Sequence, residues 1–366
     1  MNDPRAEQRD TDYRAGEEEK RSEHVKYHDG APFGVSHFVP AEANEAELRQ
    51  YFDLTKEIIA EVSPTLPAPQ YEAYVEELRN PLSYRGPREC WVARHDGRIA
   101  GTAEITFFEH ENGRYAQAVV RVTRKLRRHG IGSAMLSACL DTVNARGRDI
   151  LVGNNVQDAT PGMKWVTALG FVVTRRSLWQ TLHVGEVDPG LWSTPIPRAF
   201  RLKRWIDSTP NELVESFARA RTAIADAPAD QSGLRHPAWT VARVREREAE
   251  LSALGEERRF IVAVHEPTGD VAGLTEVALD PSLPNTCFQE DTAVLSQYRG
   301  LGLGRTMKGA MMQWLTADRP AIAEVRTTTA ADNVHMIRVN RQLGYVTTAV
   351  LNTVEVATGE LAMMRR

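Results

Sequence analysis

The sequence predicts an α/β protein built from two tandem copies of one fold, each a mixed central sheet flanked by helices. Two observations predict the duplication: three segments recur in the same order, and the spacing between the copies is nearly constant. The matched pairs, 172 or 174 positions apart, are 99–104 with 271–276, 127–132 with 299–304, and 169–171 with 343–345. Repeats this long indicate duplicated domains, because solenoid repeats span about 20–50 residues.

The chain has 366 residues, a length that suggests two domains at roughly 100–200 residues each. Residues 1–30 are dense in charged side chains and poor in large aliphatic ones, so we expect a disordered or loose arm there. Three prolines and two glycines between 184 and 198 predict a linker. We therefore predict an N-terminal domain over 31–187, a linker over 188–198 and a C-terminal domain over 199–366.

Composition excludes several classes of protein. The formal net charge of -4 gives no global field that would favour nucleic acid or an anionic membrane. No segment is apolar enough to span a bilayer, and the N-terminus lacks the apolar core of a secretory signal. Cys90, Cys139 and Cys287 lie too far apart in the sequence for a CxxC pair, which argues against a zinc site or a disulfide framework. We expect a cytoplasmic protein without nucleic-acid or membrane partners.

Each copy is predicted to begin its sheet with a β-hairpin, since candidate strands flank a turn dipeptide that contains glycine. The hairpin strands are 91–94 and 99–108 around Asp96-Gly97, and 260–265 and 271–279 around Thr268-Gly269. A further strand is predicted after each hairpin, at 115–123 and at 287–295.

A helix is predicted after each of these strands, because apolar residues recur on one helical face. The apolar stripes are Met135, Leu136, Cys139, Leu140 and Val143 in the first copy, and Met307, Met311, Trp314 and Leu315 in the second. A strand (149–153 and 323–329), a short helix and a last strand complete each copy. We expect both stripes to face a core.

A glycine-bearing loop between strand and helix is the motif that points to chemistry. The loops read RRHGIGS at 127–133 and RGLGLGR at 299–305. Glycines allow a tight turn and a close approach of a ligand to the backbone. The following helix directs unpaired N–H groups and its positive dipole end into the same space. The pattern therefore predicts an anion site suited to a pyrophosphate.

Two familiar phosphate loops do not fit this pattern. A Rossmann loop needs GxGxxG, but Arg305 takes the sixth position after Gly300 and Gly302, and the first copy has only two glycines. A Walker loop needs Gly-Lys followed by Ser or Thr, which neither copy has. What remains is R-x-x-G-x-G after a strand and before a helix.

This remaining motif resembles the coenzyme A pyrophosphate loop of the GNAT acetyltransferase superfamily, R-x-x-G-x-G/A between the fourth strand and the third helix. The pattern NxxMxxxNxxLGY at 333–345 resembles that family's later helix and turn. The resemblance covers nearly all of 33–366 and is to the tandem GNAT proteins. It implies two splayed sheets and transfer of an acetyl or other acyl group from acetyl-CoA, or another acyl-CoA, to an amine of a small molecule by direct attack.

The resemblance also implies cofactor contacts. The backbone at the end of each fourth strand would pair with the pantetheine arm, the loop amides would hold the pyrophosphate, and Asn333 would lie near the cofactor at a helix start. The implied residues of the first copy are Val122, Arg127, Arg128, Gly130, Ile131, Gly132 and Ser133. Those of the second copy are Val294, Leu295, Arg299, Gly300, Gly302, Leu303, Gly304, Arg305 and Asn333. No metal is expected.

Attack on a thioester needs a neutral amine, so we expect a base beside the parted strands. Glu276 lies on the third strand of the second copy, and Glu104 is its counterpart in the first. Glu290 and Asp291 lie on the fourth strand, where the first copy has apolar residues. Because adjacent strand residues face opposite ways, we expect only one of this pair to face the acylation site. We favour Asp291 together with Glu276.

The sequence does not show which residue would act as the general acid that protonates the leaving thiolate. Many GNAT enzymes carry a tyrosine five residues before the aromatic residue of the glycine turn, where this chain has Val166 and Asn340. Neither titrates, but Asn340 can form hydrogen bonds and is retained as a catalytic candidate. Water or another residue would then protonate the thiolate. Pro161 and Gly162 are expected to shorten or disrupt the start of the matching helix in the first copy.

These differences suggest a division of labour. We expect the second copy to do the chemistry, and the first to bind acyl-CoA as a structural element or to shape an acceptor pocket between the domains. The reverse assignment stays open, because the first loop matches the family motif at least as well. A catalytically silent acyl-CoA-binding module and a protein lysine or N-terminal acetyltransferase are competing functions. The latter predicts an acidic groove for a basic peptide. Either a monomer or a homodimer fits the sequence.

Overall fold

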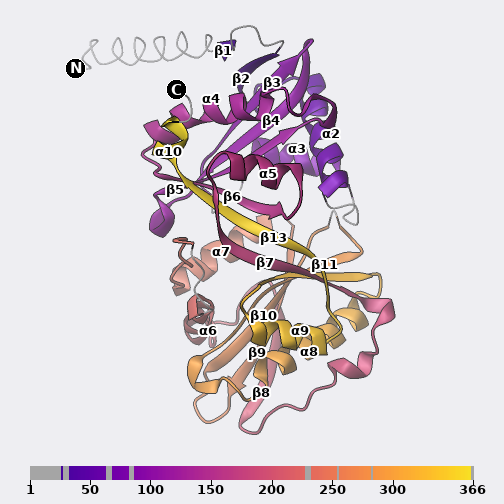
Figure 1. The fold of residues 1–366 in the computed structure, drawn as a ribbon. Coiled ribbons are helices and arrows are strands. Elements are labelled where there is room, and N and C mark those ends of the chain that lie inside the picture. Colours follow the sequence, from indigo (N-terminus) through magenta and orange to yellow (C-terminus); the bar gives the residue numbers. More distant parts are fainter. Residues whose placement is uncertain are drawn as a thin grey trace, which may run out of the picture.

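The computed structural model shows two α/β halves that share one sheet (Figure 1). It describes residues 26–27, 33–62, 68–81, 86–226, 232–253, 255–281 and 283–363. The predicted arm over 1–30 lies outside the described residues, apart from the short strand β1 (Lys26–Tyr27).

The N-terminal half contains the predicted hairpin, strand, helix, strand, helix and strand in that order, and two helices precede the hairpin. Its elements are β2 (Phe33–Phe38), α2 (Glu45–Val62), α3 (Tyr71–Arg79), β3 (Arg88–His95), β4 (Arg98–Phe107), β5 (Tyr115–Val122), α4 (Ile131–Ala145), β6 (Ile150–Gln157), α5 (Pro161–Ala168) and β7 (Val172–His183).

The C-terminal half repeats this order, and α10 follows its last strand. Its elements are β8 (Phe200–Ile206), α6 (Val214–Thr222), α7 (Val241–Ala253), β9 (Glu257–His265), β10 (Val271–Leu279), β11 (Thr286–Val294), α8 (Leu303–Asp318), β12 (Glu324–Ala330), α9 (Val334–Gln342), β13 (Val346–Ala357) and α10 (Thr358–Met363). Across the described ranges, no helix combines the length and apolar character needed to cross a bilayer.

Both predicted hairpins are confirmed, since β3 pairs antiparallel with β4 and β9 with β10. Asp96 and Gly97 both adopt positive φ angles, 49° and 74°, as a two-residue turn that matches strand twist requires. The predicted apolar stripes of α4 and α8 are buried, except that Trp314 is only partly covered. These periodic patterns therefore located the sheet and the helices that pack on it.

The last strands of the two halves are exchanged, which the sequence did not predict. Strand β13 pairs antiparallel with β6 of the N-terminal half, and β7 pairs antiparallel with β12 of the C-terminal half. The exchanged strands also pair with each other, so one 13-stranded sheet runs β1-β2-β3-β4-β5-β6-β13-β7-β12-β11-β10-β9-β8. In Figure 1, β13 crosses into the other half, and α10 ends beside α4. Each half thus contains one strand from beyond the predicted linker.

Each half opens its sheet where two parallel strands meet, as the family resemblance implied. Strands β5 and β6 pair only over Tyr115–Gln117 and Ile150–Val152. Strands β11 and β12 pair only over Thr286–Phe288 and Glu324–Arg326. Both β5 and β11 continue beyond these residues towards their glycine loops, and their parallel partners part from them. The parted strands leave an opening through the sheet of each half.

Helices cover both faces of the C-terminal sheet. Ile261 of β9 packs in one core cluster with Met307 of α8, and the next-door Phe260 packs in another with Phe217 of α6. Because neighbouring strand residues face opposite ways, α8 and α6 lie on opposite faces. A ligand held at the start of α8 and one held beside α6 would therefore approach the opening from two sides.

Lys308 is a buried lysine in the interior of α8. Only 2% of it is exposed, and its Nζ lies 5.1 Å from the centre of the Tyr345 ring. Leu136 occupies the matching position of the first copy. Burial lowers the pKa of Lys308 to about 7, because the protonated form is disfavoured away from water. The folded chain therefore holds this proton much less tightly than the unfolded chain.

We expect Lys308→Met to raise stability and to remove part of its pH dependence. Between pH 7 and 10 the unfolded chain keeps a proton that the folded chain has lost, so wild-type stability should rise with pH by about 1.4 kcal/mol per unit. In the variant this rise should disappear, with the gain largest at pH 7 and below. Urea unfolding across this range measures it. Lys164→Met, at an exposed lysine, is the control, and an unchanged slope in Lys308→Met would contradict the prediction.

The strand exchange predicts that the halves cannot fold apart. Residues 1–187 expressed alone should aggregate, because without β13 the edge of β6 and both edges of β7 lack their partners. Co-expression with 199–366 should recover a soluble one-to-one complex, measured by co-purification. Full-length protein cleaved within 193–198 is the control and should remain one particle. A soluble, cooperatively unfolding N-terminal half would contradict the prediction.

Candidate active site

The two glycine loops have the same backbone shape at the start of α4 and α8. Gly130 and Gly302 both have φ of 83°, a left-handed value that glycine adopts without strain. Among the described residues no side chain caps either helix, and apart from the adjoining residues no atom lies within 4 Å of where a Cβ would stand on either glycine. The first N–H groups of both helices therefore have no side-chain acceptor in this part of the chain, as an anion site requires.

The arginine of each motif fixes its loop to the preceding strand. The Nε of Arg127 donates to the carbonyl of Val122, and the Nε of Arg299 donates to that of Val294, both at 3.0 Å. Arg127 also forms a bidentate pair with Glu61 of α2, at 2.7 and 2.6 Å. These contacts hold the loops in shape and direct the arginines back to the protein.

The two helix starts differ in what covers them. In the N-terminal half, the Trp165 indole donates to the Ser133 hydroxyl at 3.1 Å and lies 3.5 Å from where a Cβ on Gly132 would stand. In the C-terminal half, the nearest atom to the equivalent point on Gly304 is 3.9 Å away. The Arg305 Nε is buried there and has no hydrogen-bond partner in the described part of the chain. The second helix start is the more open one.

A β-bulge on β11 brings two carboxylates together. Thr275 of β10 lies opposite Thr292, but Val277 lies opposite Gln289, so Glu290 and Asp291 share the position across from Glu276. Strict alternation would place only one of them on the acylation side, and that expectation was wrong because the bulge inserts an extra residue into the strand. The matching strands β4 and β5 pair in regular register. The bulge therefore distinguishes the C-terminal half.

A cavity of about 630 Å³ lies against this bulge. Both Glu290 and Asp291 line it, together with Glu276. Other walls come from α6, α7 and the segment before α7, and from residues 108–112 between β4 and β5 of the N-terminal half. The cavity thus lies on the face of the sheet opposite α8 and is completed by both halves. Its size suits a small-molecule ligand.

The carboxylates at the bulge are perturbed in the direction a base requires. Although 46% of the Glu290 side chain is exposed, the surrounding protein removes enough water to raise its pKa to about 7, and the negative charges of Glu276 and Asp291 add to this while Arg258 opposes it. Removal from water, followed by the charge of Glu276, also raises the pKa of Asp291. The nearest arginine nitrogens lie 4.0 Å from Glu290 and 3.7 Å from Asp291, so neither carboxylate is tightly paired.

Glu276 is held differently, by two arginines. Its side chain is 2% exposed and lies 2.7 Å from Arg221 and 3.2 Å from Arg258. The guanidinium of Arg221 also stacks 4.1 Å from the centre of the Trp239 ring. Glu276 is therefore placed to fix both arginines, and its charge helps to raise the pKa of Glu290 and of Asp291.

The matching position of the N-terminal half is closed by a charged network. Glu104 lies 2.5 Å from Arg121 and 3.5 Å from Arg88, and it accepts a hydrogen bond from the Tyr51 hydroxyl at 3.1 Å. All four side chains are largely or fully buried, and no bulge interrupts the strand. The N-terminal half therefore keeps a carboxylate at this position, but the carboxylate is already paired with neighbouring arginines and a tyrosine hydroxyl.

Comparison with models of known protein families shows to which family the chain belongs. The family model described as the acetyltransferase (GNAT) family matches residues 54–171 and 223–345. These two matches include both glycine loops, the bulged strand β11 and its counterpart β5. The chain belongs to the GNAT acetyltransferase family. The two separate matches agree with the tandem arrangement of its halves.

Solved structures share the fold of this GNAT protein. A tandem GNAT protein from the clavulanic acid biosynthesis pathway has a TM-score of 0.74 and 23% identity, with 89% of this chain and 99% of that chain covered. A GCN5-related N-acetyltransferase from Sphaerobacter thermophilus has a TM-score of 0.66 and 12% identity, with 89% and 96% covered. A search among curated proteins finds no match. These identities support the fold and leave the acceptor open.

Asn340 of this GNAT protein lies away from the cavity. It is fully buried, and its Nδ2 donates to Gln180 of the exchanged strand β7 at 2.8 Å and to Thr329 at 3.1 Å. The amide thus ties α9 to the junction between the halves. Asn333 caps the start of α9 by accepting from the Met336 N–H at 3.0 Å, at the helix start where it was expected.

The matching helix α5 is not disrupted at its start, contrary to expectation. It begins at Pro161, directly after Thr160, whose hydroxyl accepts from the Met163 N–H at 3.2 Å. Proline suits the first helical position because its missing N–H has no partner there anyway. A proline directly after the capping residue starts a helix, whereas a proline further inside would disrupt it. The sequence pattern did not fix where the cap lies.

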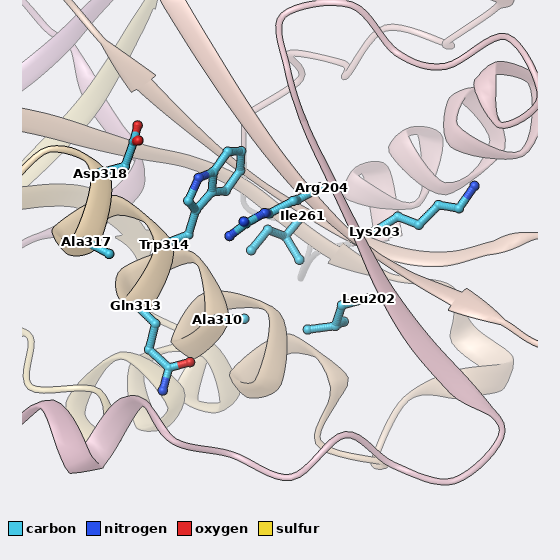
Figure 2. A pocket seen from close by; sticks show the side chains of 9 residues that line it. All are labelled: Leu202, Lys203, Arg204, Ile261, Ala310, Gln313, Trp314, Ala317 and Asp318. Carbon is cyan, nitrogen blue, oxygen red and sulfur yellow. The ribbon is translucent and has the colours of Figure 1, made fainter.

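A second groove, of about 550 Å³, lies between β8 and α8 (Figure 2). Its Trp314 ring lies 4.8 Å from the Arg204 guanidinium and 4.9 Å from that of Arg259. Asp318 is hydrogen-bonded to Arg259, which lowers the pKa of Asp318. The described lining therefore holds arginines stacked beside a tryptophan ring and a carboxylate that is paired with an arginine. It holds no carboxylate with a raised pKa, so this groove is not the candidate active site.

Proposed function

We propose that this protein transfers an acetyl or other acyl group from acetyl-CoA, or another acyl-CoA, to an amine of a small molecule, and that the C-terminal half does the chemistry. The observation that carries the proposal is the bulge that directs Glu290 and Asp291 into one cavity beside a parted sheet. An open glycine loop serves the same opening from the other face.

The residues at the start of α8 fit a pyrophosphate. The uncapped N–H groups after Gly302 and the buried, unsatisfied Nε of Arg305 are donors without acceptors among the described residues. An anion would satisfy them. The end of β11 from Val294 to Leu295, where the sheet has opened, would pair with the pantetheine arm. Asn333 at the start of α9 would lie beside it.

Acyl-CoA would supply an activated thioester, and the remaining steps fall to the protein. A free alkylamine has a pKa near 10, so it arrives protonated at neutral pH. Glu290, ionised above its pKa of about 7, accepts this proton directly or through one water and frees the lone pair for attack. Asp291 beside it, favoured by the sequence, is the alternative base. The attacking nitrogen passes its second proton through water to the departing thiolate.

We propose a supporting role for the N-terminal half. Its glycine loop has the backbone shape for acyl-CoA, but Glu104 is neutralised by Arg121 and Arg88. It would therefore bind the cofactor without transfer, while its 108–112 segment shapes the acceptor cavity. A catalytically silent module and a protein acetyltransferase remain the competing functions. The acidic cavity lining favours the second over the first, because a basic peptide would suit it.

The first test separates the two loops. Gly302→Glu should abolish release of free thiol from acetyl-CoA in the presence of an amine panel, because an anion would occupy the pyrophosphate position in the catalytic half. Gly130→Glu should leave most of this turnover. Mass spectrometry of co-purified thioester should show a separate loss of ligand from each variant.

Gly269→Glu is the matched control for these changes. Gly269 also has positive φ and open space at its Cβ position, but it lies in the β9–β10 turn. It should therefore reproduce the backbone strain while retaining turnover. If Gly130→Glu abolishes turnover and Gly302→Glu does not, the N-terminal half is the catalytic one.

The second test concerns the base. Glu290→Gln should lower kcat/KM by about 10²–10⁴-fold, the usual contribution of general base catalysis. In the wild type, kcat/KM should rise with pH through about 7, as Glu290 loses its proton, and this limb should vanish in the variant. Initial rates at saturating acetyl-CoA from pH 5.5 to 9 measure both effects.

Asp291→Asn distinguishes the two carboxylates. It should keep the limb but shift it to lower pH, because removing a negative charge lowers the pKa of Glu290. If Asp291→Asn instead loses the limb and Glu290→Gln retains it, Asp291 is the base.

A further inference from the structure

We propose that the acceptor is a small dicationic amine, whose second positive group binds between residues 108–112 of the N-terminal half and helix α7. This inference rests on the proposed function and adds the substrate class. It follows from which charges in the cavity are already matched, and from how the two halves are held together around it.

The described cavity lining is rich in carboxylates. They are Glu109, Glu111, Glu246, Glu250, Glu276, Glu290 and Asp291, against the four arginines Arg221, Arg243, Arg247 and Arg258. Seven carboxylates against four arginines leave an excess of three negative charges once the pH is above the pKa of Glu290, before the histidines are counted. A cavity with this excess attracts cations.

The arginines do not offset the carboxylates that remain. Arg221 and Arg258 both bind Glu276, and Arg258 also binds Glu256 at 2.7 Å. Arg243 pairs with Glu111 at 3.2 Å and donates to the Ala238 carbonyl at the same distance. These three arginine charges are therefore engaged with protein groups inside or beside the cavity.

Two carboxylates lie apart from the catalytic pair and have no ion-pair partner in the described part of the chain. Glu109 lies in the connection after β4 in the N-terminal half, Glu246 lies on α7 of the C-terminal half, and both are exposed. Both line the same cavity as Glu290. One amine of the ligand can thus meet Glu290 while a second cation meets Glu109 and Glu246.

The wall that carries Glu109 is held in place before a ligand binds. Asn112 makes two hydrogen bonds with the Arg235 backbone: its Nδ2 donates to the carbonyl at 3.0 Å and its Oδ1 accepts from the N–H at 2.8 Å. The Glu111–Arg243 pair adds a second bridge between the halves. A fixed wall lowers the ordering entropy that a ligand must overcome, so the charge pattern can select among acceptors.

An acceptor that carries a carboxylate, such as an amino acid, would be disfavoured. Its anion would need an arginine to leave a carboxylate of the protein, and the excess negative charge would repel it. In the transfer step one ammonium gives its proton to Glu290, the C–N bond forms and the C–S bond breaks. The attacking nitrogen loses its second proton through water to the thiolate, so the products are the amide, the free thiol and protonated Glu290. The second ammonium stays protonated throughout and keeps its place.

Three amines with the same carbon chain test the proposal: butylamine, 1,4-diaminobutane and 4-aminobutanoate. With acetyl-CoA, kcat/KM should fall in the order diamine, monoamine, amino acid, and the diamine preference should shrink as salt is raised. Glu246→Gln should reduce the ratio of diamine to monoamine kcat/KM by about two- to fivefold, as expected for loss of an exposed ion pair. Glu266→Gln, at an exposed acid in the β9–β10 turn, should leave the ratio unchanged.

Thermal shift with 1,4-diaminobutane separates this inference from the proposed function. Stabilisation by the diamine but not by butylamine, lost in Glu246→Gln, supports the dication site even if no amine is acylated, and that result would overturn the proposed function alone. Turnover with equal kcat/KM for diamine and monoamine overturns the inference alone. A lysine-bearing basic peptide with a higher kcat/KM than the diamine also overturns the inference. If the diamine shows no binding and no amine is turned over, both the inference and the proposed function are overturned.

Discussion

The pairing of the exchanged strands is the interaction on which the rest of this molecule depends. Strands β7 and β13 each span 12 residues, lie side by side at the centre of the sheet and each complete the other half. Their ladder orients the halves so that residues 108–112 reach the cavity of the C-terminal half. A flexible linker between independent domains would not hold that wall in a fixed position. The site therefore depends on an architecture formed far from it.

Much of the fold could be predicted because it follows from local patterns. Glycine turns placed the hairpins, apolar periodicity placed α4 and α8, and the loop motif placed the helix starts. The exchange of strands could not be predicted in this way. An alternating strand specifies which side chains face the core, but it does not specify which sheet the strand joins, and each half ends in a strand at the equivalent position. The choice of partner is then decided by the connection and by packing over the whole sheet.

Prediction of the site from the sequence was limited in a similar way by a single inserted residue. Alternation on β11 predicted that Glu290 and Asp291 face opposite ways, and the bulge opposite Glu276 overturned that expectation. No glycine marks this bulge, so the sequence carried no local sign of it. Comparison of the two copies carried an indirect one: the pair is acidic only in the second copy, where the first has Ala118 and Val119. A charged pair that has no counterpart in a duplicated strand points to a function present in one copy alone.

The duplicated carboxylate stands in different surroundings in the two copies. Glu104 and Glu276 occupy equivalent strand positions and both are buried against arginines. In the N-terminal half this network lies beside a regular strand with apolar neighbours, and the charge of Glu104 is matched by Arg121 and Arg88. In the C-terminal half two more carboxylates stand opposite the same buried charge, and removal from water together with that charge raises their pKa. One inserted residue thus places the buried carboxylate beside two perturbed acids in one copy, where the other copy has a regular strand with apolar neighbours.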